Sequence, residues 1–286
     1  MLGSVGDLVE DVVVRLHEQV NVASDTQATV IRRRGGSAAN VIAAACRAGG
    51  AARFIGQVGD DATGLGLTQA LLADGADLIV RRAGRTGTVV VLVDLAGERT
   101  MLSDRAACTD LADPEATWLD GLHTLHIPFY SLVGEPLATT TATLARWAAE
   151  RGIRVSIDTS SVALLNQVGS AHALARMGSL RPSVVLANEL EAAALGSELH
   201  PDNLGGALVI VKHGAQPATV FEAGRSPQEV AAESVESVHD TTGAGDAFAA
   251  GLLLALADGA DPVAATRRAH SVAAEAVRRA SARAVL

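Results

Sequence analysis

The sequence predicts an α/β protein with a mostly parallel central sheet covered by helices. In the second half of the chain, short apolar runs that suit buried strands alternate with helical segments, and these runs lie at 122–128, 155–158, 184–187 and 208–212. The chain has 286 residues, of which 49% are hydrophobic, so it is long enough for one large domain or two small ones. Only 2% are aromatic, so the core is expected to consist mainly of Ala, Val and Leu.

Composition and charge narrow the range of partners. The net charge is −9, and the longest block of like charge is Arg32–Arg34, which argues against nucleic acid. The longest apolar run, 247–257, is too short to cross a bilayer. Cys46 and Cys108 fit a reduced protein without a disulfide framework, and no leader pattern opens the chain. We therefore expect a cytoplasmic protein that binds neither nucleic acid nor membrane.

The N-terminal part is expected to hold a buried strand and two hairpins. Residues 2–6 have the pattern of a short buried strand. Val12–Leu16 and Ala28–Arg32 alternate weakly and frame a polar turn, and Thr88–Leu95 and Arg99–Ser103 frame a second turn. Each of these pairs is predicted to form a β-hairpin.

Glycine-rich turns open helices at two places in this part of the chain. Gly35 and Gly36 precede an alanine-rich helical segment that contains Asn40. A side-chain amide offers both donors and an acceptor, which suits the hydroxyls of a polyol. A second run, 49–64, passes through a strand and several glycines before the next predicted helix.

The stretch 240–251 begins polar, passes through Gly243 and Gly245, and then becomes apolar. This pattern predicts a glycine turn that leads into a helix N-terminus, where free N–H groups and the helix dipole form an anion hole. Asp246 at its mouth is suited to take the proton of a hydroxyl that attacks a phosphoryl group, although it could also simply cap the helix. Asn188 and Lys212 follow strand ends, where ligands of parallel sheets bind, so they could converge with Asp246.

Two strings of residues resemble the signatures of the ribokinase-like (PfkB) carbohydrate kinases. The string D-T-T-G-A-G-D-A-F-x-A-G at 240–251 is similar to the C-terminal signature, and 35–64 is similar to the N-terminal one, with G-G-x-x-x-N and G-x-x-G-D-D-x-x-G. The resemblance implies a single domain over 1–286 with the fold of a three-layer α/β/α sandwich. It also implies a small β-sheet lid, formed by about 12–34 and 87–105 and inserted in the core.

The resemblance implies transfer of the γ-phosphate of ATP to a hydroxymethyl group of a sugar. Asp246 would be the general base, and Gly243, Ala244 and Gly245 would supply N–H donors. The residues expected to bind the sugar are Asp11, Gly35, Gly36, Asn40 and Arg105. Asp11 matches the acid of the family's first strand, although Asp7 lies near enough to be confused with it. Arg105 is equally well interpreted as a surface guanidinium.

The resemblance also implies residues for ATP and for metal ions. The expected ATP-binding residues are Asn188, Lys212, Gly214, Gly243, Gly245 and His270. Asn188 and Glu191 would hold Mg²⁺ through water, and Asp240 and Thr242 would hold a monovalent cation such as K⁺. Each assignment has a plainer alternative: Asn188 and Glu191 as a helix cap, Lys212 as a strand-end residue, and His270 as a core histidine. Pro217 replaces a glycine of the family's nucleotide loop.

The predicted substrate is a free sugar or sugar acid. Both lid segments lack Phe, Tyr and Trp, whose rings would stack on the base of a nucleoside. A nucleoside kinase, a sugar-phosphate kinase or a catalytically silent binding regulator of the same fold are the alternatives. A dinucleotide-dependent oxidoreductase is disfavoured because no G-x-G-x-x-G opens the first strand–helix unit. The lid hairpins, which cannot bury their apolar residues alone, are expected to pair in a homodimer.

Overall fold

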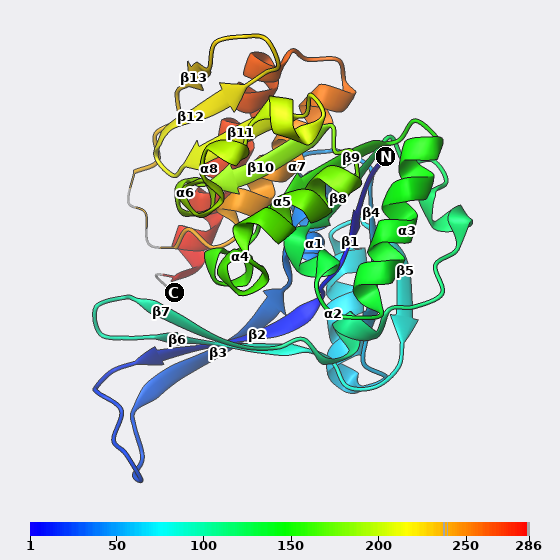
Figure 1. The fold of residues 1–286 in the computed structure, drawn as a ribbon. Helices are drawn as coiled ribbons and strands as arrows, with labels where there is room; N and C mark the ends of the chain where they lie inside the picture. The colour runs from blue at the N-terminus through cyan, green and yellow to red at the C-terminus, as the bar shows by residue number, and fades with distance from the viewer. Residues whose placement is uncertain (237, 239, 285–286) are drawn as a thin grey trace.

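The computed structural model of the protein describes residues 1–236, 238 and 240–284. It contains a large sheet flanked by helices and a separate small sheet (Figure 1). The strands of the large sheet are β1 (Leu2–Val5), β4 (Ala52–Val58), β5 (Asp77–Arg82), β8 (Thr124–Pro128), β9 (Arg154–Asp158), β10 (Val184–Asn188), β11 (Leu208–His213), β12 (Gln216–Phe221) and β13 (Gln228–Val230). The α-helices are α1 (Ser37–Arg47), α2 (Ala62–Ala73), α3 (Leu137–Glu150), α4 (Val162–Val168), α5 (Ser170–Ser179), α6 (Glu189–Leu195), α7 (Ala244–Ala257) and α8 (Pro262–Ala284). Short 3₁₀ turns lie at Ala106–Asp110, Ala116–Leu119, Phe129–Leu132, Gly196–Glu198 and Pro201–Leu204.

The large sheet has the strand order β13-β12-β11-β10-β9-β8-β1-β4-β5. All neighbours from β11 to β5 pair in parallel, whereas β12 and β13 pair antiparallel at one edge. Parallel neighbours must be joined by crossovers, and the helices between the strands supply them. The order reverses at β1, which lies between β8 and β4, and ligands of such sheets bind beyond the carboxyl ends of the strands.

The two faces of the large sheet are covered by different helices. Along β10, Val184 and Leu186 pack into one core together with α1, α2, α7 and α8. Val185 and Ala187 point the opposite way and pack with α3, α4 and α5. This period-two alternation places a hydrophobic core on each face, which makes the three-layer α/β/α sandwich that the sequence predicted.

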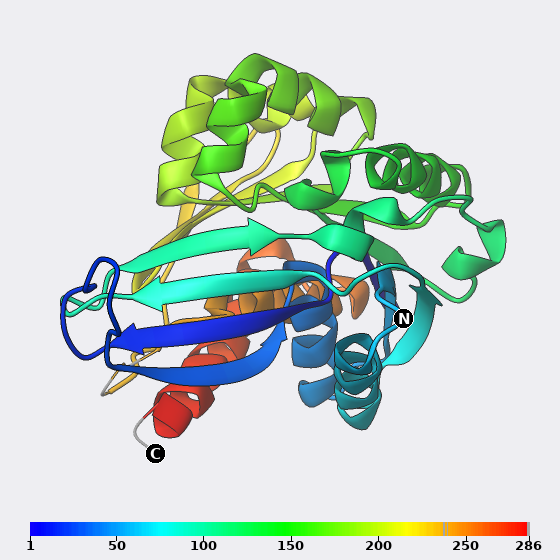
Figure 2. The same ribbon diagram turned by 90° about the horizontal axis from the view of Figure 1, so that it is seen from below.

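The small sheet has four strands: β2 (Val9–Leu16), β3 (Ala28–Gly35), β6 (Thr88–Val93) and β7 (Arg99–Asp104). They are ordered β3-β2-β6-β7, with each hairpin antiparallel and the two central strands parallel to each other. Figure 2 shows the four strands side by side, and Figure 1 shows the sheet nearly edge-on below the large sheet. One face therefore turns toward the large sheet, and we call it the inner face of the small sheet.

Several elements begin or end elsewhere than the sequence indicated. Strand β2 begins at Val9 and β3 continues to Gly35, so these two strands are longer than predicted. Helix α2 begins at Ala62, because Asp61 caps it by accepting a hydrogen bond from the Gly64 N–H. Among the described residues, no helix is both long and apolar enough to cross a membrane.

Candidate active site

The N-termini of helices α7 and α1 lie against each other, and Asp246 connects them. Gly243 precedes α7 with a left-handed φ of 78°, which glycine adopts at little cost, and Asp246 lies in the first turn of the helix. The Ser37 hydroxyl donates to Asp246 Oδ1 at 2.7 Å, and the Asn40 amide donates to Oδ2 at 3.0 Å. The two glycine-led helices predicted from the sequence thus meet at one carboxylate.

The N–H groups around Asp246 are only partly available to an anion. The Ala244 N–H donates to Thr241 O at 3.1 Å, so this predicted donor already has a partner. The N–H groups of Gly245 and Asp246 make no hydrogen bond to the rest of the described backbone, as expected for the first turn of a helix. The Gly243 N–H is likewise without a partner in the described backbone, so the candidate donors of the predicted anion hole include the N–H groups of Gly243, Gly245 and Asp246 but not that of Ala244.

The protonation of Asp246 is tuned by its surroundings. Burial raises the pKa of this carboxyl to about 6, a rise that the hydrogen bonds from Ser37 and Asn40 oppose. The negative charge of Asp158 raises the pKa further, and the positive charge of Lys212 lowers it. A carboxylate with a pKa of about 6 is ionised at neutral pH and basic enough to accept a proton from an alcohol in the transition state.

Lys212 lies beside the N-terminus of α7. A Cβ atom added at Gly245 would lie 3.6 Å from Lys212 Nζ, so the ammonium borders the predicted anion hole. Lys212 Nζ also donates to Asp158 Oδ2 at 2.7 Å, and both side chains are mostly buried. Burial alone would lower the pKa of Lys212, but the attraction of Asp158 raises it above its usual value, so the ammonium stays charged.

Asp158 belongs to the candidate site and was not predicted from the sequence. It is the last residue of β9 and lies opposite Leu186 of β10, while Lys212 lies opposite Asn188. The available signal was its position, because an acid at the carboxyl end of a buried parallel strand faces the ligand-binding edge. The partner was not predictable, since it comes from β11, two strands away.

Asn188 and Glu191 form a complete capping box at the start of α6. Asn188 Oδ1 accepts from the Glu191 N–H at 2.9 Å, and Glu191 Oε2 accepts from the Asn188 N–H at 2.8 Å. The Thr159 hydroxyl donates to Glu191 Oε2 at 2.6 Å. Burial and the nearby charge of Asp158 raise the pKa of Glu191. The capping alternative therefore describes the contacts that these residues make.

The predicted sugar residues Asp11, Gly35 and Gly36 pack closely together at the base of the small sheet. A Cβ added at Gly35 would lie 2.0 Å from Asp11 Oδ1, and one at Gly36 would lie 2.2 Å from Asp7 O. Gly36, with a left-handed φ of 97° and backbone atoms of Asp7 beside it, thus requires glycine, whereas a side chain at position 35 would have to displace the Asp11 carboxylate. Burial raises the pKa of Asp11 to about 6, against the opposing effect of Arg33.

Arg105 does not offer a free positive charge. Its Nε donates to Asp7 Oδ2 at 2.7 Å, and its Nη2 donates to Asp7 Oδ1 at 2.8 Å. A third bond, from Nη1 to Val133 O at 3.2 Å, completes the fixation of the guanidinium. This bidentate pair neutralises Arg105, which contradicts its interpretation as a free surface guanidinium and weakens its assignment as an anion ligand. The carboxylate that neutralises Arg105 is Asp7, the acid that lies near enough to Asp11 in the sequence to be confused with it.

Asp240 and Thr242 are held by two arginines of the small sheet. Arg33 Nη1 donates to Asp240 Oδ2 at 3.1 Å, and Arg99 Nη2 donates to Asp240 Oδ1 at 2.8 Å. Arg99 Nη1 also donates to the Thr242 hydroxyl at 2.6 Å. The residues predicted for a monovalent cation therefore do not fit one in this structure, because guanidinium groups surround the carboxylate that would bind it.

His270 and Gly214 differ from the roles expected for ATP. His270 is buried, lies 3.1 Å from Val230 O through Nε2, and makes an edge-to-face contact with Phe248 at 5.1 Å between ring centroids. This is the core histidine of the alternative interpretation. Gly214, with a left-handed φ of 62°, turns the chain between β11 and β12, and Pro217 lies within β12. Neither position has a feature that points to a nucleotide.

The donor set suits Mg²⁺ held through water and phosphate. Among the described residues, no three His, Cys, Asp or Glu side chains lie together as a set that could enclose a metal ion. Mg²⁺ keeps several waters and commonly binds one or two carboxylates together with phosphates of the substrate. The buried carboxylates of Asp158 and Glu191, which influence each other's charge, fit that mode of binding.

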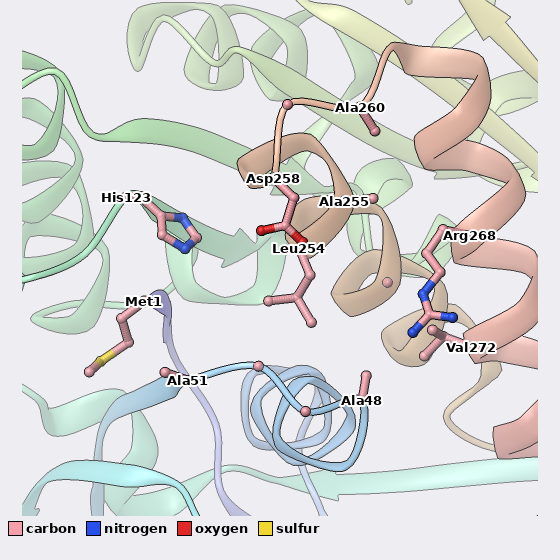
Figure 3. Close-up of a pocket in the computed structure, with 14 residues that line it drawn as sticks. Met1, Ala48, Ala51, His123, Leu254, Ala255, Asp258, Ala260, Arg268 and Val272 are labelled. Atoms are coloured by element: carbon pink, nitrogen blue, oxygen red, sulfur yellow. The ribbon is translucent and has the colours of Figure 1, made fainter.

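A cavity of about 740 Å³ lies at the end of the large sheet where the parallel strands begin, opposite the end that carries Asp158 and Lys212 (Figure 3). Met1 and Ala51, which line it, directly precede β1 and β4, and His123 directly precedes β8. The cavity is thus at the beginnings of the strands, away from Asp246 and Lys212. None of the residues predicted to bind sugar, ATP or metal lines it.

A buried carboxylate at the N-terminus of α7, an ammonium beside that N-terminus, and the polar side chains of Ser37 and Asn40 from α1 make a candidate phosphotransferase site on this fold. The profile of the pfkB family carbohydrate kinase matches residues 2–286, so the chain belongs to the pfkB family of carbohydrate kinases. It is 33% identical over 264 residues to a fructokinase from Klebsiella pneumoniae, across 83% of this chain and 81% of that protein. It is also 33% identical over 239 residues to an ATP-dependent ribose-1-phosphate kinase from Halopiger xanaduensis, across 80% of this chain and 76% of that protein.

The likeness extends to solved structures. The crystal structure of an adenosine kinase from Sinorhizobium meliloti matches with a TM-score of 0.83 over 98% of both chains, and at 23% identity this likeness shows the fold. The fold class and the family predicted from the sequence are confirmed. The protein is an ATP-dependent carbohydrate kinase, that is, a phosphotransferase that acts on a sugar hydroxyl.

Proposed function

We propose that the protein transfers the γ-phosphoryl group of ATP to a hydroxymethyl group of a neutral free sugar, with Asp246 as the general base. The observation that carries this proposal is the position of Asp246 between two helix N-termini. Its two oxygens accept bonds from Ser37 and Asn40, which belong to the segment expected to bind the sugar. A carboxylate has further lone pairs beyond these two bonds, so it can also accept the proton of a substrate hydroxyl.

The groups around Asp246 suit the charge that develops during transfer. Phosphoryl transfer proceeds through a loose transition state, so catalysis consists mainly of positioning and charge stabilisation. The N–H groups of Gly245 and Asp246 and the Lys212 ammonium lie where the transferred group would meet Asp246. Mg²⁺ bound to the phosphates would neutralise part of their charge, and Asp158 and Glu191 would hold its waters.

A neutral sugar is favoured over an acidic one by the pairing of Arg105 with Asp7. A guanidinium that is already bound by a carboxylate has lost most of its attraction for a second anion. Arg105 was the residue expected to bind the acidic group of a sugar acid, so its pairing with Asp7 weakens the prediction of a sugar-acid substrate. The relatives named fructokinase make a ketose the first candidate. A ribose-1-phosphate kinase among the relatives makes a sugar phosphate the main competitor.

The small sheet is proposed to act as the lid, as expected for segments 12–34 and 87–105 of a single kinase domain. Its inner face carries Asp11 and reaches the loop before α7 through Arg33 and Arg99. Closure over the sugar would exclude water, which otherwise competes for the phosphoryl group. We also propose a cytoplasmic location, because Cys46 and Cys108 are free thiols and ATP is the phosphoryl donor.

The test is ADP release across a panel of fructose, ribose, a 2-keto-3-deoxy sugar acid, ribose 1-phosphate and adenosine. We expect the highest kcat/KM for a neutral sugar. Asp246→Asn should lower kcat by about 10²–10⁴-fold while ATP binding persists, because a general base contributes about that factor. Asp261→Asn is the matched control, since Asp261 caps α8 by accepting from the Ala264 N–H at 2.9 Å.

The Asp246→Asn variant, the substrate panel and the Arg105→Ala variant each have an outcome that contradicts the proposal. A kcat for Asp246→Asn within a few-fold of the wild-type value would mean that Asp246 only caps α7, as Asp261 caps α8. Adenosine or ribose 1-phosphate as the best substrate would reject the neutral sugar. Arg105→Ala should reduce activity toward all sugars alike; a loss confined to acidic substrates would restore Arg105 as an anion ligand.

A further inference from the structure

The carboxylate of Asp240 is the most heavily bonded acid near the active site. It is 4% exposed, and its Oδ1 accepts from the Thr242 N–H at 2.9 Å, the Thr242 hydroxyl at 2.5 Å and Arg99 Nη2 at 2.8 Å. Its Oδ2 accepts from Arg33 Nη1 at 3.1 Å. Burial alone would raise the pKa of Asp240, but the bonds from Thr242 and the arginines hold it well below its usual value. Asp240 therefore stays ionised in the folded protein.

The two arginines come from the opposite edges of the small sheet. Arg33 belongs to β3 and Arg99 to β7, and these are the first and last strands in the order β3-β2-β6-β7. In register, Arg33 lies opposite Asp11, and Arg99 lies opposite Val93. Because side chains alternate along a strand, both arginines project from the inner face. They converge on Asp240 from two sides, with the central strands between them.

Asp240 and Thr242 in turn fix the loop that leads into α7. Thr242 directly precedes Gly243, and its hydroxyl accepts from Arg99 Nη1 at 2.6 Å and from Arg33 Nη2 at 3.4 Å. On the other side, the Asp240 N–H donates to the Ser281 hydroxyl of α8 at 3.2 Å. The arginines thus act on the backbone that places the N–H groups of Gly245 and Asp246, although neither arginine contacts Asp246.

We propose that Arg33 and Arg99 are positioning residues for the anion hole and take the place of a monovalent cation at Asp240. A buried carboxylate needs a positive partner, and the guanidinium pair supplies it through directed bonds. Both arginines belong to the small sheet, so in this structure the sheet itself supplies the positive charge beside Asp240. The kinase is then independent of K⁺. This inference rests on the reaction proposed at Asp246.

The experiment first establishes wild-type activity with the best sugar of the panel, in choline chloride and in KCl at equal ionic strength. Absence of activity with every substrate would reject the proposed function rather than this inference. We expect equal rates, within two-fold, in the two salts. We expect the melting temperature of the unliganded wild-type protein to be the same in both salts as well, which tests the site without catalysis.

The double variant Arg33→Ala/Arg99→Ala is then compared with the wild type. We expect kcat to fall roughly 10–100-fold with a smaller change in the KM of the sugar, because misplacing catalytic groups by about 1 Å costs up to that factor. We expect KCl or guanidinium chloride at millimolar concentration to restore part of kcat, and KCl to raise the melting temperature. Arg32→Ala is the matched control, because Arg32 lies on the other face of β3 and pairs with Glu10.

Three outcomes would overturn the inference. The first is a wild-type rate that rises several-fold in KCl over choline chloride, which would reveal an open cation site. The second is a double variant with unchanged kcat and an unchanged melting temperature. The third is a loss of kcat in Arg32→Ala as large as in the double variant, which would trace the effect to net charge. If the double variant does not fold, Arg99→Lys, which keeps the charge but loses the paired bonds, replaces it in the same comparison.

Discussion

The pKa of Asp246 is the residue-scale property that most directly governs the proposed reaction. A base with a pKa of about 6 is protonated, and therefore inactive, below that pH. We expect kcat/KM for the sugar to fall on the acid side with an apparent pKa near 6, because kcat/KM reports the ionisation of the free enzyme. Measuring initial rates of ADP release between pH 5 and pH 8 checks this.

Lys212→Met sharpens the same measurement. The ammonium lowers the pKa of Asp246, and its removal also leaves the charge of Asp158 uncompensated, so both changes raise the pKa of Asp246. The acid limb should therefore move to higher pH. Arg154→Met removes the same charge at the beginning of β9, at the far end of the strand from Asp158, and should leave the limb in place. If the acid limb of the pH profile does not move in Lys212→Met, the Lys212 charge does not influence the pKa of the catalytic base.

At the scale of residues, the sequence indicated those groups of the candidate site that lie in long local motifs. Asp246, Asn40 and Gly243 were predicted because glycine turns, an amide and an acid stand at fixed spacing within single segments. Asp158, Arg33 and Arg99 were missed because their roles depend on partners far along the chain; Arg33 and Asp240 are 207 residues apart. Arg105 shows the same limit, since its neutralising partner Asp7 is 98 residues away.

At the scale of elements, Glu191 at the start of α6 has two roles: it completes the capping box of the helix, and it is proposed to hold Mg²⁺ through water. Glu191→Gln replaces an acceptor of three bonds by a group that can accept at one atom only. We expect the Mg²⁺ concentration for half-maximal activity to rise more than the KM of the sugar changes, because a carboxylate beside Asp158 is lost. Unfolding should become easier by about 1–3 kcal/mol, the cost of leaving a buried partner unsatisfied.

The control is Glu189→Gln, an exposed acid in the first turn of the same helix. It changes the charge near the helix N-terminus equally but leaves the capping box intact. If the Mg²⁺ titration of Glu191→Gln overlays the wild-type curve while the melting temperature falls, Glu191 caps helix α6 and has no role in binding Mg²⁺.

Elements were predicted where pattern and turn chemistry agree, and less well where tertiary pairing extends them. The parallel strands read as short apolar runs because both of their faces are buried. Strand β3 continues to Gly35 because Arg32 to Gly35 pair with Val9 to Val12 of β2, although the charged run Arg32–Arg34 has no strand pattern of its own. The parallel pairing of β2 with β6 joins the two predicted hairpins into one sheet and could not be read from either hairpin.

At the scale of the whole molecule, the small sheet leaves one apolar face uncovered. On the inner face, Val13 and Val91 of the central strands are buried, although Ile31 and Met101 of the edge strands are 47% and 61% exposed; on the outer face, Val30 and Leu102 are 57% and 55% exposed. The register places seven large apolar side chains on the outer face, namely Val12, Val14, Leu16, Val30, Val90, Leu92 and Leu102. Soluble monomers rarely expose large contiguous apolar patches, and such patches commonly mark sites of interaction with another protein.

We propose that a second copy of this chain covers the outer face, so that two small sheets pack against each other in a homodimer. Two such faces are self-complementary, as a two-fold interface requires. Helix α2 of the same chain reaches one end of this face, where Arg34 Nη1 donates to Asp74 Oδ2 at 2.7 Å. Leu102→Glu should convert the dimer to a monomer, because facing carboxylates would be desolvated and repel each other. Met101→Glu is the control, since Met101 is 61% exposed and its side chain alternates to the inner face. Sedimentation velocity at micromolar concentration distinguishes the monomer from the dimer. A monomeric wild type would reject the homodimer. A Met101→Glu variant that dissociates as Leu102→Glu does would mean that the dimer contact is not confined to the outer face.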